Sequence, residues 1–487
     1  MKILSAVSEI YPLIKTGGLG DVVGALPAAL KIHGVAVVTL VPGYPQLLKA
    51  LDRAQPVLEI ADLFGGRARV LRAFVSGLDL FVIDAPHLYD RPGTPYANTQ
   101  GEDWPDNALR FGALSWMAAR IGLGDIPEFV PDVVHCHDWQ AGLVPVYIAF
   151  AGARVATVIT IHNLAYQGKF PAHFLSALRL PQSAFSIHGV EYYGGIGFLK
   201  AALRFADRIT TVSPTYAAEI LTSENGLGLE GLLRSRSAVL TGIANGIDTK
   251  VWDPENDERI PVRFGPQSLS QRAYNTSVLR QRFGLSEGQN RILMAVVSRL
   301  VWQKGLDLLA DAVPALLAQG MQFAILGTGD SDLEQRLRAL GSAYPGQVGC
   351  IIGYDEDLAH LVQAGADGLF IPSRFEPCGI TQLCAMRYGA VPVAAKVGGL
   401  ADTVTDVDCA NGTRPTGFHI SPVTTLGIEA AGQRVMGLWG DRTRWQRLQQ
   451  NGMSTDVSWT RSAGQYASLY ADLVAAKSSH PPMPGHP

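Results

Sequence analysis

The sequence has few cysteines, no long apolar run and almost no net charge. Five cysteines in 487 residues are scattered without a paired spacing. They do not indicate a disulfide framework, so we expect a reduced, cytoplasmic compartment. No apolar run approaches membrane-spanning length, and the first residues show no signal-peptide pattern. The 40 basic residues nearly balance the 43 acidic ones, which excludes a global electrostatic attraction to nucleic acid or anionic lipid.

Short β-branched runs alternate with amphipathic helical patterns along the whole chain. This rhythm predicts an α/β fold with parallel sheets, and the length suggests two domains. The rhythm pauses in a polar, turn-rich stretch from Asn245 to Pro261, so we place the domain boundary near residue 245. Two doubly wound, Rossmann-like domains with a deep cleft between them are expected. The predicted strands are 2–7, 35–41, 132–135, 156–161 and 208–212, then 292–297, 322–326, 347–352, 368–371 and 391–394.

The segment from Pro372 to Gly389 carries the strongest functional signal. An apolar run over 368–371 reads as a buried parallel strand, so Glu376 falls beyond its carboxyl end, where α/β sheets bind ligands. Its carboxylate can accept hydrogen bonds from sugar hydroxyls. Gly379 allows a ligand to approach the backbone, and the helix start at Thr381 suits a phosphate. This segment therefore predicts both a sugar contact and a phosphate contact.

A glycine-rich loop, Lys15-Thr-Gly-Gly-Leu-Gly-Asp21, follows the first predicted strand and precedes a helix expected over 22–31. Gly17 and Gly18 would admit a phosphate or sugar, Lys15 would supply charge, and Asp21 could cap the helix or bind a ligand. A plain glycine turn explains the loop equally well. It is not a Walker loop, and the Gly-Thr-Gly stretch beginning at residue 327 does not complete a dinucleotide fingerprint, which disfavours a dehydrogenase.

Two cations flank the end of the predicted strand 292–297. Arg299 offers a planar bidentate fork and Lys304 a movable charge, so together they could neutralise a departing nucleoside diphosphate. Taken alone, they are better explained without a ligand, with Arg299 in a structural ion pair and Lys304 at the start of a solvated helix face. Together with the Glu376 loop in the same predicted domain, they favour diphosphate binding.

Histidines and carboxylates recur near other strand ends. His135, His137 and Asp138 could hold zinc, but no fourth ligand is apparent and we assign no metal. Asp138 is expected instead at the strand end, lining the cleft. His162 and Asn163 follow the strand 156–161 at the same edge. Asn245 follows another strand, where a glycine turn slightly outweighs ligand binding as an explanation. The two-carboxylate patterns at 330–332 and 406–408 are too short to indicate a metal site.

Taken together, these segments resemble the bacterial glycogen synthase and plant starch synthase family. The matching motifs occur in the family's order and cover both halves of the chain. They are Lys15-Thr-Gly-Gly-Leu-Gly-Asp-Val, His137-Asp-Trp-Gln, His162-Asn-Leu-Ala-Tyr-Gln-Gly, Ser298-Arg-Leu-Val-Trp-Gln-Lys-Gly and Phe375-Glu-Pro-Cys-Gly-Ile-Thr-Gln-Leu. The departures are mild, such as Gly20 where many members have alanine.

The resemblance implies a B-type glycosyltransferase fold and a hexosyltransferase. Its domains would be 1–244 on the acceptor side and 245–456 for the nucleotide sugar, followed by a helix over 457–477 that crosses back to the first domain, and a disordered tail over 478–487. The implied reaction transfers glucose from ADP-glucose to the non-reducing end of an α-1,4-glucan with retention, without a cofactor. The implied catalytic residues are His162, Glu376, Arg299, Lys304 and Asp138. The implied donor-binding residues are Lys15, Gly17, Gly18, Asp21, Asn163, Asn245, Arg299, Lys304, Cys378, Gly379 and Thr381.

Several alternatives stay open from the residues alone. A phosphorylase-like enzyme would need pyridoxal phosphate on a lysine, and no lysine has a context that we would nominate. A non-catalytic glucan-binding or nucleotide-sugar-sensing protein would keep the fold, although the intact Lys15, Arg299, Lys304 and Glu376 argue against it. The choice between ADP-glucose and UDP-glucose depends on pocket shape. Both a covalent and a front-face retaining route fit the carboxylates present.

Overall fold

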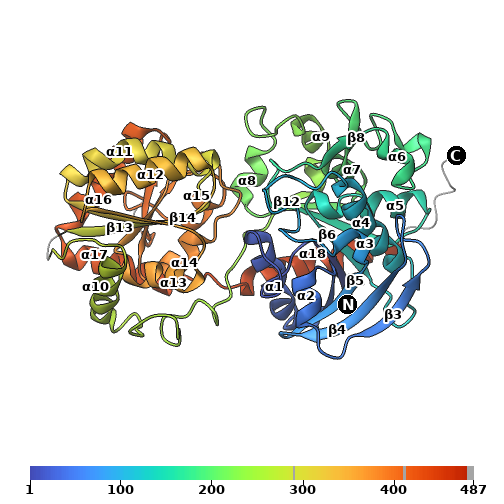
Figure 1. Ribbon diagram of the computed structural model, residues 1–487, viewed down its shortest axis with the longest axis horizontal. Helices are drawn as coiled ribbons and strands as arrows, with labels where there is room; N and C mark the ends of the chain where they lie inside the picture. Colours follow the sequence, from blue (N-terminus) through green and yellow to red (C-terminus); the bar gives the residue numbers. More distant parts are fainter. Residues whose placement is uncertain (289–290, 410–412, 480–487) are drawn as a thin grey trace. The chain divides into compact units, whose positions relative to one another are not determined.

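The computed structural model describes residues 1–288, 291–409 and 413–479, and the chain divides into two compact units (Figure 1). The first unit comprises Met1–Asn245 and the chain from Trp459 onward, and the second comprises Gly246–Ser458. In Figure 1 the first unit runs from blue to green and includes the red helix α18 (Thr460–Ser479). Each unit has its own sheet, flanked by helices.

The first unit is built on a nine-stranded sheet in the order β12-β11-β7-β6-β1-β2-β5-β4-β3. The strands from β12 to β5 are parallel, and β4 is antiparallel to both β5 and β3. The strand bounds are β1 Lys2–Ala6, β2 Ala36–Pro42, β3 Gln55–Ile60, β4 Ala68–Val75, β5 Leu78–Asp84, β6 Val133–His137, β7 Ala156–Ile161, β11 Arg208–Thr211 and β12 Leu240–Gly242.

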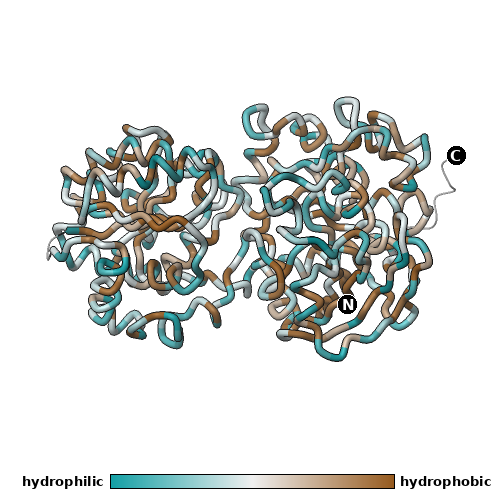
Figure 2. The backbone as a smooth tube through the Cα atoms, viewed as in Figure 1, coloured by the Kyte–Doolittle hydropathy of each residue, from teal (hydrophilic) through white to brown (hydrophobic). Residues whose placement is uncertain are grey.

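The parallel part of this sheet confirms the predicted α/β class, and the antiparallel edge adds strands that the sequence did not predict. In β4 the exposed Arg69 and Arg72 interrupt the buried residues, and Val70 and Leu71 belong to two different hydrophobic clusters. These arginines pair with Asp84 and Asp79 on the neighbouring β5. By contrast, every residue of β7 is buried, as expected for a parallel strand covered on both faces. Figure 2 shows the apolar central strands in brown.

Helices complete the first unit, together with a small antiparallel sheet in the order β8-β10-β9. The three short strands are β8 Lys169–Pro171, β9 Glu191–Tyr192 and β10 Gly195–Gly197. The α-helices are α1 Gly18–Lys31, α2 Pro45–Ala50, α3 Pro86–Tyr89, α4 Asn107–Gly122, α5 Val144–Phe150, α6 Phe174–Ala177, α7 Phe198–Phe205, α8 Pro214–Glu219 and α9 Glu230–Ser235.

The C-terminal helix α18 packs on the first unit. Trp459, Tyr466, Tyr470 and Leu473 are buried in a cluster that also contains Ile3 and residues of α1. Leu469, which the spacing placed on the same face, is only partly buried. The predicted disordered tail over 478–487 lies outside the described residues from position 480 onward, whereas positions 478 and 479 belong to α18.

The second unit is a six-stranded parallel sheet in the order β15-β14-β13-β16-β17-β18. The strands are β13 Ile292–Val297, β14 Met321–Gly327, β15 Val348–Ile352, β16 Gly368–Ile371, β17 Val391–Ala395 and β18 Phe418–Ile420. The helices are α10 Arg272–Arg282, α11 Leu306–Ala318, α12 Ser331–Ala343, α13 Glu356–Gly365, α14 Thr381–Arg387, α15 Gly398–Thr403, α16 Thr425–Trp439 and α17 Arg442–Ser454. Within the described ranges, no helix combines the length and the apolar character needed to cross a bilayer.

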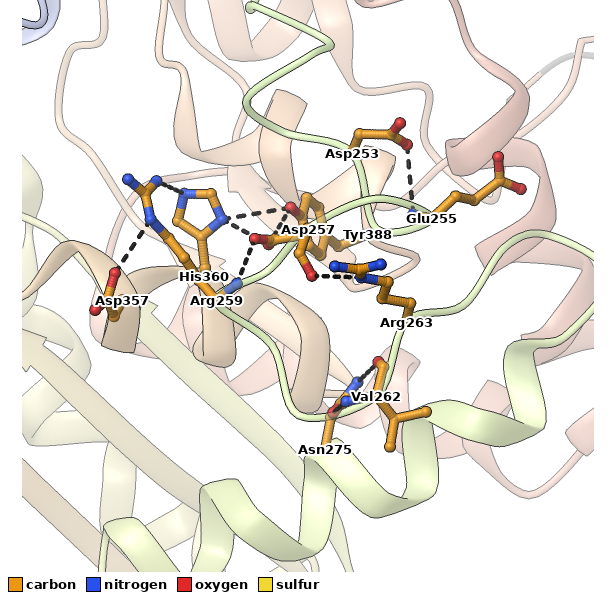
Figure 3. A network of polar contacts seen from close by, with 10 residues as sticks. All are labelled: Asp253, Glu255, Asp257, Arg259, Val262, Arg263, Asn275, Asp357, His360 and Tyr388. Carbon is orange, nitrogen blue, oxygen red and sulfur yellow. Dashed lines mark hydrogen bonds and ion pairs between the residues drawn. The ribbon is translucent and has the colours of Figure 1, made fainter.

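The polar stretch that opens the second unit is anchored by one buried carboxylate, Asp257 (Figure 3). Its Oδ2 accepts a hydrogen bond from the Tyr388 hydroxyl at 2.6 Å and lies 2.7 Å from Nδ1 of His360 on α13. The ring of Trp252 stacks on His360 with centroids 3.9 Å apart. Asp257 therefore holds a turn-rich segment against two elements that lie more than 100 residues further along the chain.

Replacing Asp257 with asparagine should lower the stability of the second unit by about 1–3 kcal/mol, because its buried partners His360 and Tyr388 exchange a charged acceptor for a neutral one. Burial acts to raise the pKa of Asp257, but the hydrogen bonds from His360 and Tyr388 outweigh it and leave the pKa below 3.8. The charged form is therefore stabilised by folding, and this stability is present above pH 4 and lost as the pH falls through the folded pKa. Thermal unfolding from pH 3 to 7 should show a wild-type advantage that shrinks below pH 4; an advantage constant over this range would contradict the assignment.

Candidate active site

In the first unit, the glycine-rich loop follows β1 at the carboxyl edge of the sheet. Helix α1 begins at Gly18, four residues earlier than predicted, so Asp21 lies in its first turn. Burial of Leu19 and Gly20 extends the helix into this glycine-rich segment. Nζ of Lys15 pairs with Oδ1 of Asp21 at 2.8 Å, a contact that the sequence did not reveal. The space where a Cβ of Gly17 would stand is open within 4 Å.

Glu9, which sequence reasoning missed, holds this loop from inside. It is 3% exposed, and its Oε2 accepts hydrogen bonds from the N–H and hydroxyl of Thr16 and from the N–H of Gly17. Its other oxygen accepts one from the Tyr96 hydroxyl at 2.9 Å. Burial raises the pKa of Glu9, against the lowering effect of these bonds. The backbone N–H groups of Thr16 and Gly17 therefore point inward to Glu9 and are not available to a ligand. A ligand at this loop would contact the start of helix α1 at Gly18 instead.

Asp138 joins the ends of β6 and β7. It is a non-glycine residue with φ of 53°, a conformation that costs about 1–3 kcal/mol and is held by surrounding contacts. Its Oδ1 accepts the backbone N–H of His162 at 2.7 Å. Burial raises the pKa of Asp138 to about 7, although hydrogen bonds from the N–H groups of His162 and Asn163 oppose this rise. The carboxylate therefore fixes the backbone of the His162 loop.

The raised pKa of Asp138 makes stability fall as the pH rises from about 4 to about 7, because the native state retains a proton that the unfolded chain has lost. In Asp138→Asn this titration is gone. We expect the midpoint of thermal unfolding of the variant, relative to wild type, to be higher at pH 8 than at pH 5. A difference between the two proteins that stays constant over this range would contradict the assignment.

The three histidines at this edge are engaged with protein groups. The rings of His135 and His137 lie 4.2 Å apart, on the same face of β6 as expected. His135 contacts the Tyr470 and Thr160 hydroxyls at 2.7 and 2.6 Å. Burial lowers the pKa of His162 and of His135 to about 3, and lowers the pKa of His137 well below 6.5. All three rings are therefore neutral near pH 7, and no group of three potential metal ligands occurs among the described residues.

The two asparagines predicted to bind the donor, Asn163 and Asn245, differ in their surroundings. Oδ1 of Asn163 accepts the N–H of Ala165 at 3.0 Å and so shapes a local turn. Asn245 is 8% exposed, and within the described chain its Oδ1 has no hydrogen-bond partner. A buried carbonyl oxygen without a partner calls for a donor. This observation favours ligand binding by Asn245 over the glycine-turn explanation.

In the second unit, the structure joins two predicted site residues directly. Lys304 ends the short 3-10 helix η5 (Trp302–Lys304) after β13, and Glu376 follows β16. Lys304 Nζ lies 2.5 Å from Oε2 of Glu376, and the same oxygen accepts a hydrogen bond from the Ser373 hydroxyl at 3.0 Å. The side chains are 19% and 8% exposed. A cation and a carboxylate thus meet, largely desolvated, at the carboxyl edge of this sheet.

The other predicted residues of this unit lie around that pair. Arg299 is exposed two residues after β13. Cys378 is buried, and the carbonyl oxygens of Cys378 and Gly379 accept hydrogen bonds from Gln382. Gly379 has φ of 72°, and a Cβ there would lie 2.4 Å from Gln382 Oε1, so the position requires glycine. Thr381 begins α14, a helix of only seven residues.

Two further residues of the second unit bear on the predictions: Tyr354 adds an aromatic ring at the sheet edge, and Arg434 binds the carboxylates at 406 and 408. Tyr354, which sequence reasoning missed, follows β15 at the same sheet edge and is 71% exposed. An exposed aromatic ring there is a ready stacking surface for a nucleobase. Arg434 of α16 forms ion pairs with both Asp406 and Asp408. The two carboxylates at 406–408 therefore bind an arginine side chain of the same unit.

Two α/β units built on parallel strands, with the candidate site residues at the carboxyl edges of their sheets, are typical of a B-type glycosyltransferase fold. Sucrose-phosphate synthase from Thermosynechococcus elongatus has the same fold, with a TM-score of 0.58 at 19% identity over 98% of this chain and 99% of that one. Residues 2–235 match the family model of the starch synthase catalytic domain, and residues 277–451 match that of glycosyl transferases group 1.

Full-length relatives narrow the class further. A glycogen synthase from Rhodopseudomonas palustris (strain BisB18) is 58% identical over 98% of both chains, and glycogen synthase 2 from Bradyrhizobium diazoefficiens is 54% identical over 98% of this chain and 99% of its own. The catalytic domain of starch synthase IV from Arabidopsis thaliana, solved with ADP and acarbose, superposes with a TM-score of 0.86 at 32% identity over 97% of this chain and 99% of that one. The chain belongs to the glycogen synthase and starch synthase family of hexosyltransferases.

Proposed function

We propose that the protein transfers glucose from ADP-glucose to the non-reducing end of an α-1,4-glucan, with retention and release of ADP. The observation that carries this proposal is the Lys304–Glu376 pair at the mouth of the second sheet. The bacterial relatives are named glycogen synthase, and the Arabidopsis starch synthase was solved with ADP and the sugar analogue acarbose. These names support a nucleotide-activated glucose as donor and a glucan as acceptor.

The second unit has the side chains needed to bind the donor. Lys304 and Arg299 neutralise the negative charge that develops on the departing diphosphate, which is the interaction that lowers the barrier most directly. Glu376 accepts hydrogen bonds from glucosyl hydroxyls while it holds Lys304 in place. Cys378, Gly379 and Thr381 shape the loop around the sugar and the phosphate. The exposed ring of Tyr354 supplies a stacking surface for the base.

We assign the acceptor side and the remaining sugar contacts to the first unit. Lys15, Gly17 and Gly18 approach the phosphate end of the donor, and Asp21, Asp138 and His162 surround the glucosyl group and its acceptor. Asn163 and Asn245 supply further polar contacts, of which the buried oxygen of Asn245 has the clearest need for a donor. We further propose a cytoplasmic location, which the low cysteine content of five in 487 residues supports.

The test of this proposal is incorporation of labelled glucose into glycogen, with ADP-glucose and UDP-glucose supplied in parallel. We expect incorporation from ADP-glucose and much less from UDP-glucose. A preference for UDP-glucose would overturn the donor assignment alone. Binding of glycogen by folded protein without incorporation from either donor would overturn the enzymatic proposal and favour a glucan-binding protein.

A further inference from the structure

A short chain of hydrogen bonds leads from the interior of the first unit to His162. It crosses three adjacent strands, because β6 pairs with β1 on one side and with β7 on the other. The Ser5 hydroxyl on β1 lies 3.1 Å from Nε2 of His137, the last residue of β6. Nδ1 of His137 lies 3.0 Å from Nε2 of His162, which follows β7. Ser5 and His137 are 5% and 1% exposed, so both side chains are withdrawn from bulk solvent.

The direction of each hydrogen bond follows from counting protons. A neutral imidazole has one N–H donor and one acceptor nitrogen, and a serine hydroxyl has one proton. In the described chain, the Ser5 hydroxyl contacts His137 Nε2 and no other side chain. If Nε2 were the donor, the buried hydroxyl proton of Ser5 would have no acceptor among the described protein groups, and an unmade buried hydrogen bond costs about 1–3 kcal/mol. Ser5 therefore donates to Nε2 of His137.

The positions of the ring protons of His137 and His162 follow from this direction. With Nε2 of His137 accepting, the proton of His137 is on Nδ1 and is donated to Nε2 of His162. His162 must then carry its own proton on Nδ1. Burial keeps the pKa of both rings well below 7, so neither ring gains a second proton that would break this order. The backbone N–H of His162 is bound to Asp138, which fixes the main chain at the same position.

We infer that Ser5 and His137 are positioning residues that hold His162 as the Nδ1–H tautomer, so that His162 presents a neutral N–H donor to its ligand. Such a donor selects an atom with a free lone pair, and in a sugar this is a hydroxyl oxygen. It does not attract phosphate as an imidazolium would. The identity of the ligand as the donor glucosyl group rests on the proposed function. The tautomer rests only on the contacts within the first unit.

The tautomer can be measured without any activity. In full-length protein labelled with ¹⁵N-histidine, with His162 assigned through His162→Gln, the shifts of the two ring nitrogens report which one bears the proton. We expect a protonated Nδ1 and an unprotonated Nε2 for His162 and for His137. In Ser5→Ala the signals of both rings should move toward a mixture of tautomers. A wild-type His162 protonated on Nε2, or shifts that Ser5→Ala leaves unchanged, would overturn the inference.

Kinetics provide a second, independent readout. Ser5→Ala should weaken use of ADP-glucose by about 5- to 20-fold in kcat/KM, the size expected for one lost hydrogen bond. Inhibition by ADP, which lacks the glucosyl group, should stay at the wild-type level. The matched control is Ser115→Ala, whose buried hydroxyl donates to the Gln140 carbonyl and touches no histidine. If Ser5→Ala weakens ADP and ADP-glucose equally, or behaves as the control does, Ser5 is merely structural. If NMR shows His162 protonated on Nδ1 but the protein uses neither ADP-glucose nor UDP-glucose, the proposed function fails and the tautomer assignment stands.

Discussion

Lys304→Ala should reduce kcat/KM for transfer from ADP-glucose by about 100- to 1000-fold, the usual cost of removing one preorganised charge-stabilising group. Lys304 Nζ is the cation that the structure holds against Glu376 in a largely desolvated position. Its loss removes a positive charge from the departing diphosphate and also leaves Glu376 without its ion-pair partner. Initial rates of labelled glucose incorporation measure the effect.

The control for Lys304→Ala is Arg336→Ala, which removes a cation from a surface ion pair with Asp311 in the same unit. Exposed pairs contribute little, so this variant should retain wild-type rates and stability. Circular dichroism must show that Lys304→Ala is folded. A folded Lys304→Ala with more than one tenth of the wild-type rate would contradict the role of this lysine in leaving-group stabilisation.

Glu376→Gln should cost about 100-fold in the same assay, because a nearly isosteric amide cannot hold the Lys304 ammonium by charge. The carboxylate accepts from Lys304 and from the Ser373 hydroxyl, so it positions the cation as well as the sugar. If the pair acts as a unit, the double variant with Lys304→Ala should lose about as much activity as the more damaging single change. Losses that multiply would show that the two side chains act independently.

Much of the sheet arrangement could be predicted from the sequence. Strands such as 156–161, 292–297 and 368–371 coincide with β7, β13 and β16, because strands buried on both faces are nearly continuous apolar runs. The edge strands β3, β4 and β5 were missed; in β4 the exposed Arg69 and Arg72 break the apolar pattern. The start of α1 was placed too late because glycine has a low helix propensity, which packing overrides here.

The candidate site could be predicted as single residues but not as contacts. Polar residues that follow parallel strands gather at one sheet edge, and this geometry brought Asp138, His162, Lys304 and Glu376 to attention. The ion pair between Lys304 and Glu376 joins residues 72 positions apart, and nothing local in the sequence encodes such a distance. Glu9 escaped notice because a carboxylate next to an apolar strand resembles an ordinary surface residue until its burial is known.

The histidines His135, His137 and His162 also show that side-chain contacts between distant segments cannot be read from the sequence. The spacing of His135 and His137 correctly placed both rings on one face of β6. The sequence left a zinc site conceivable, because it does not show that the ring nitrogens are already bonded to Tyr470, Thr160, Ser5 and His162. Partners from distant segments decide whether a histidine is a metal ligand or part of a hydrogen-bonded core.

The most direct test of the central claim is to measure, in one reaction, the ADP released from ADP-glucose and the α-1,4-linked glucosyl units added to glycogen. The proposed function predicts equal amounts of the two products, formed only when glycogen is present and lost together in Lys304→Ala. ADP release without chain extension would show that water, rather than a glucan, accepts the sugar. Absence of both products with folded protein would contradict glucosyl transfer altogether.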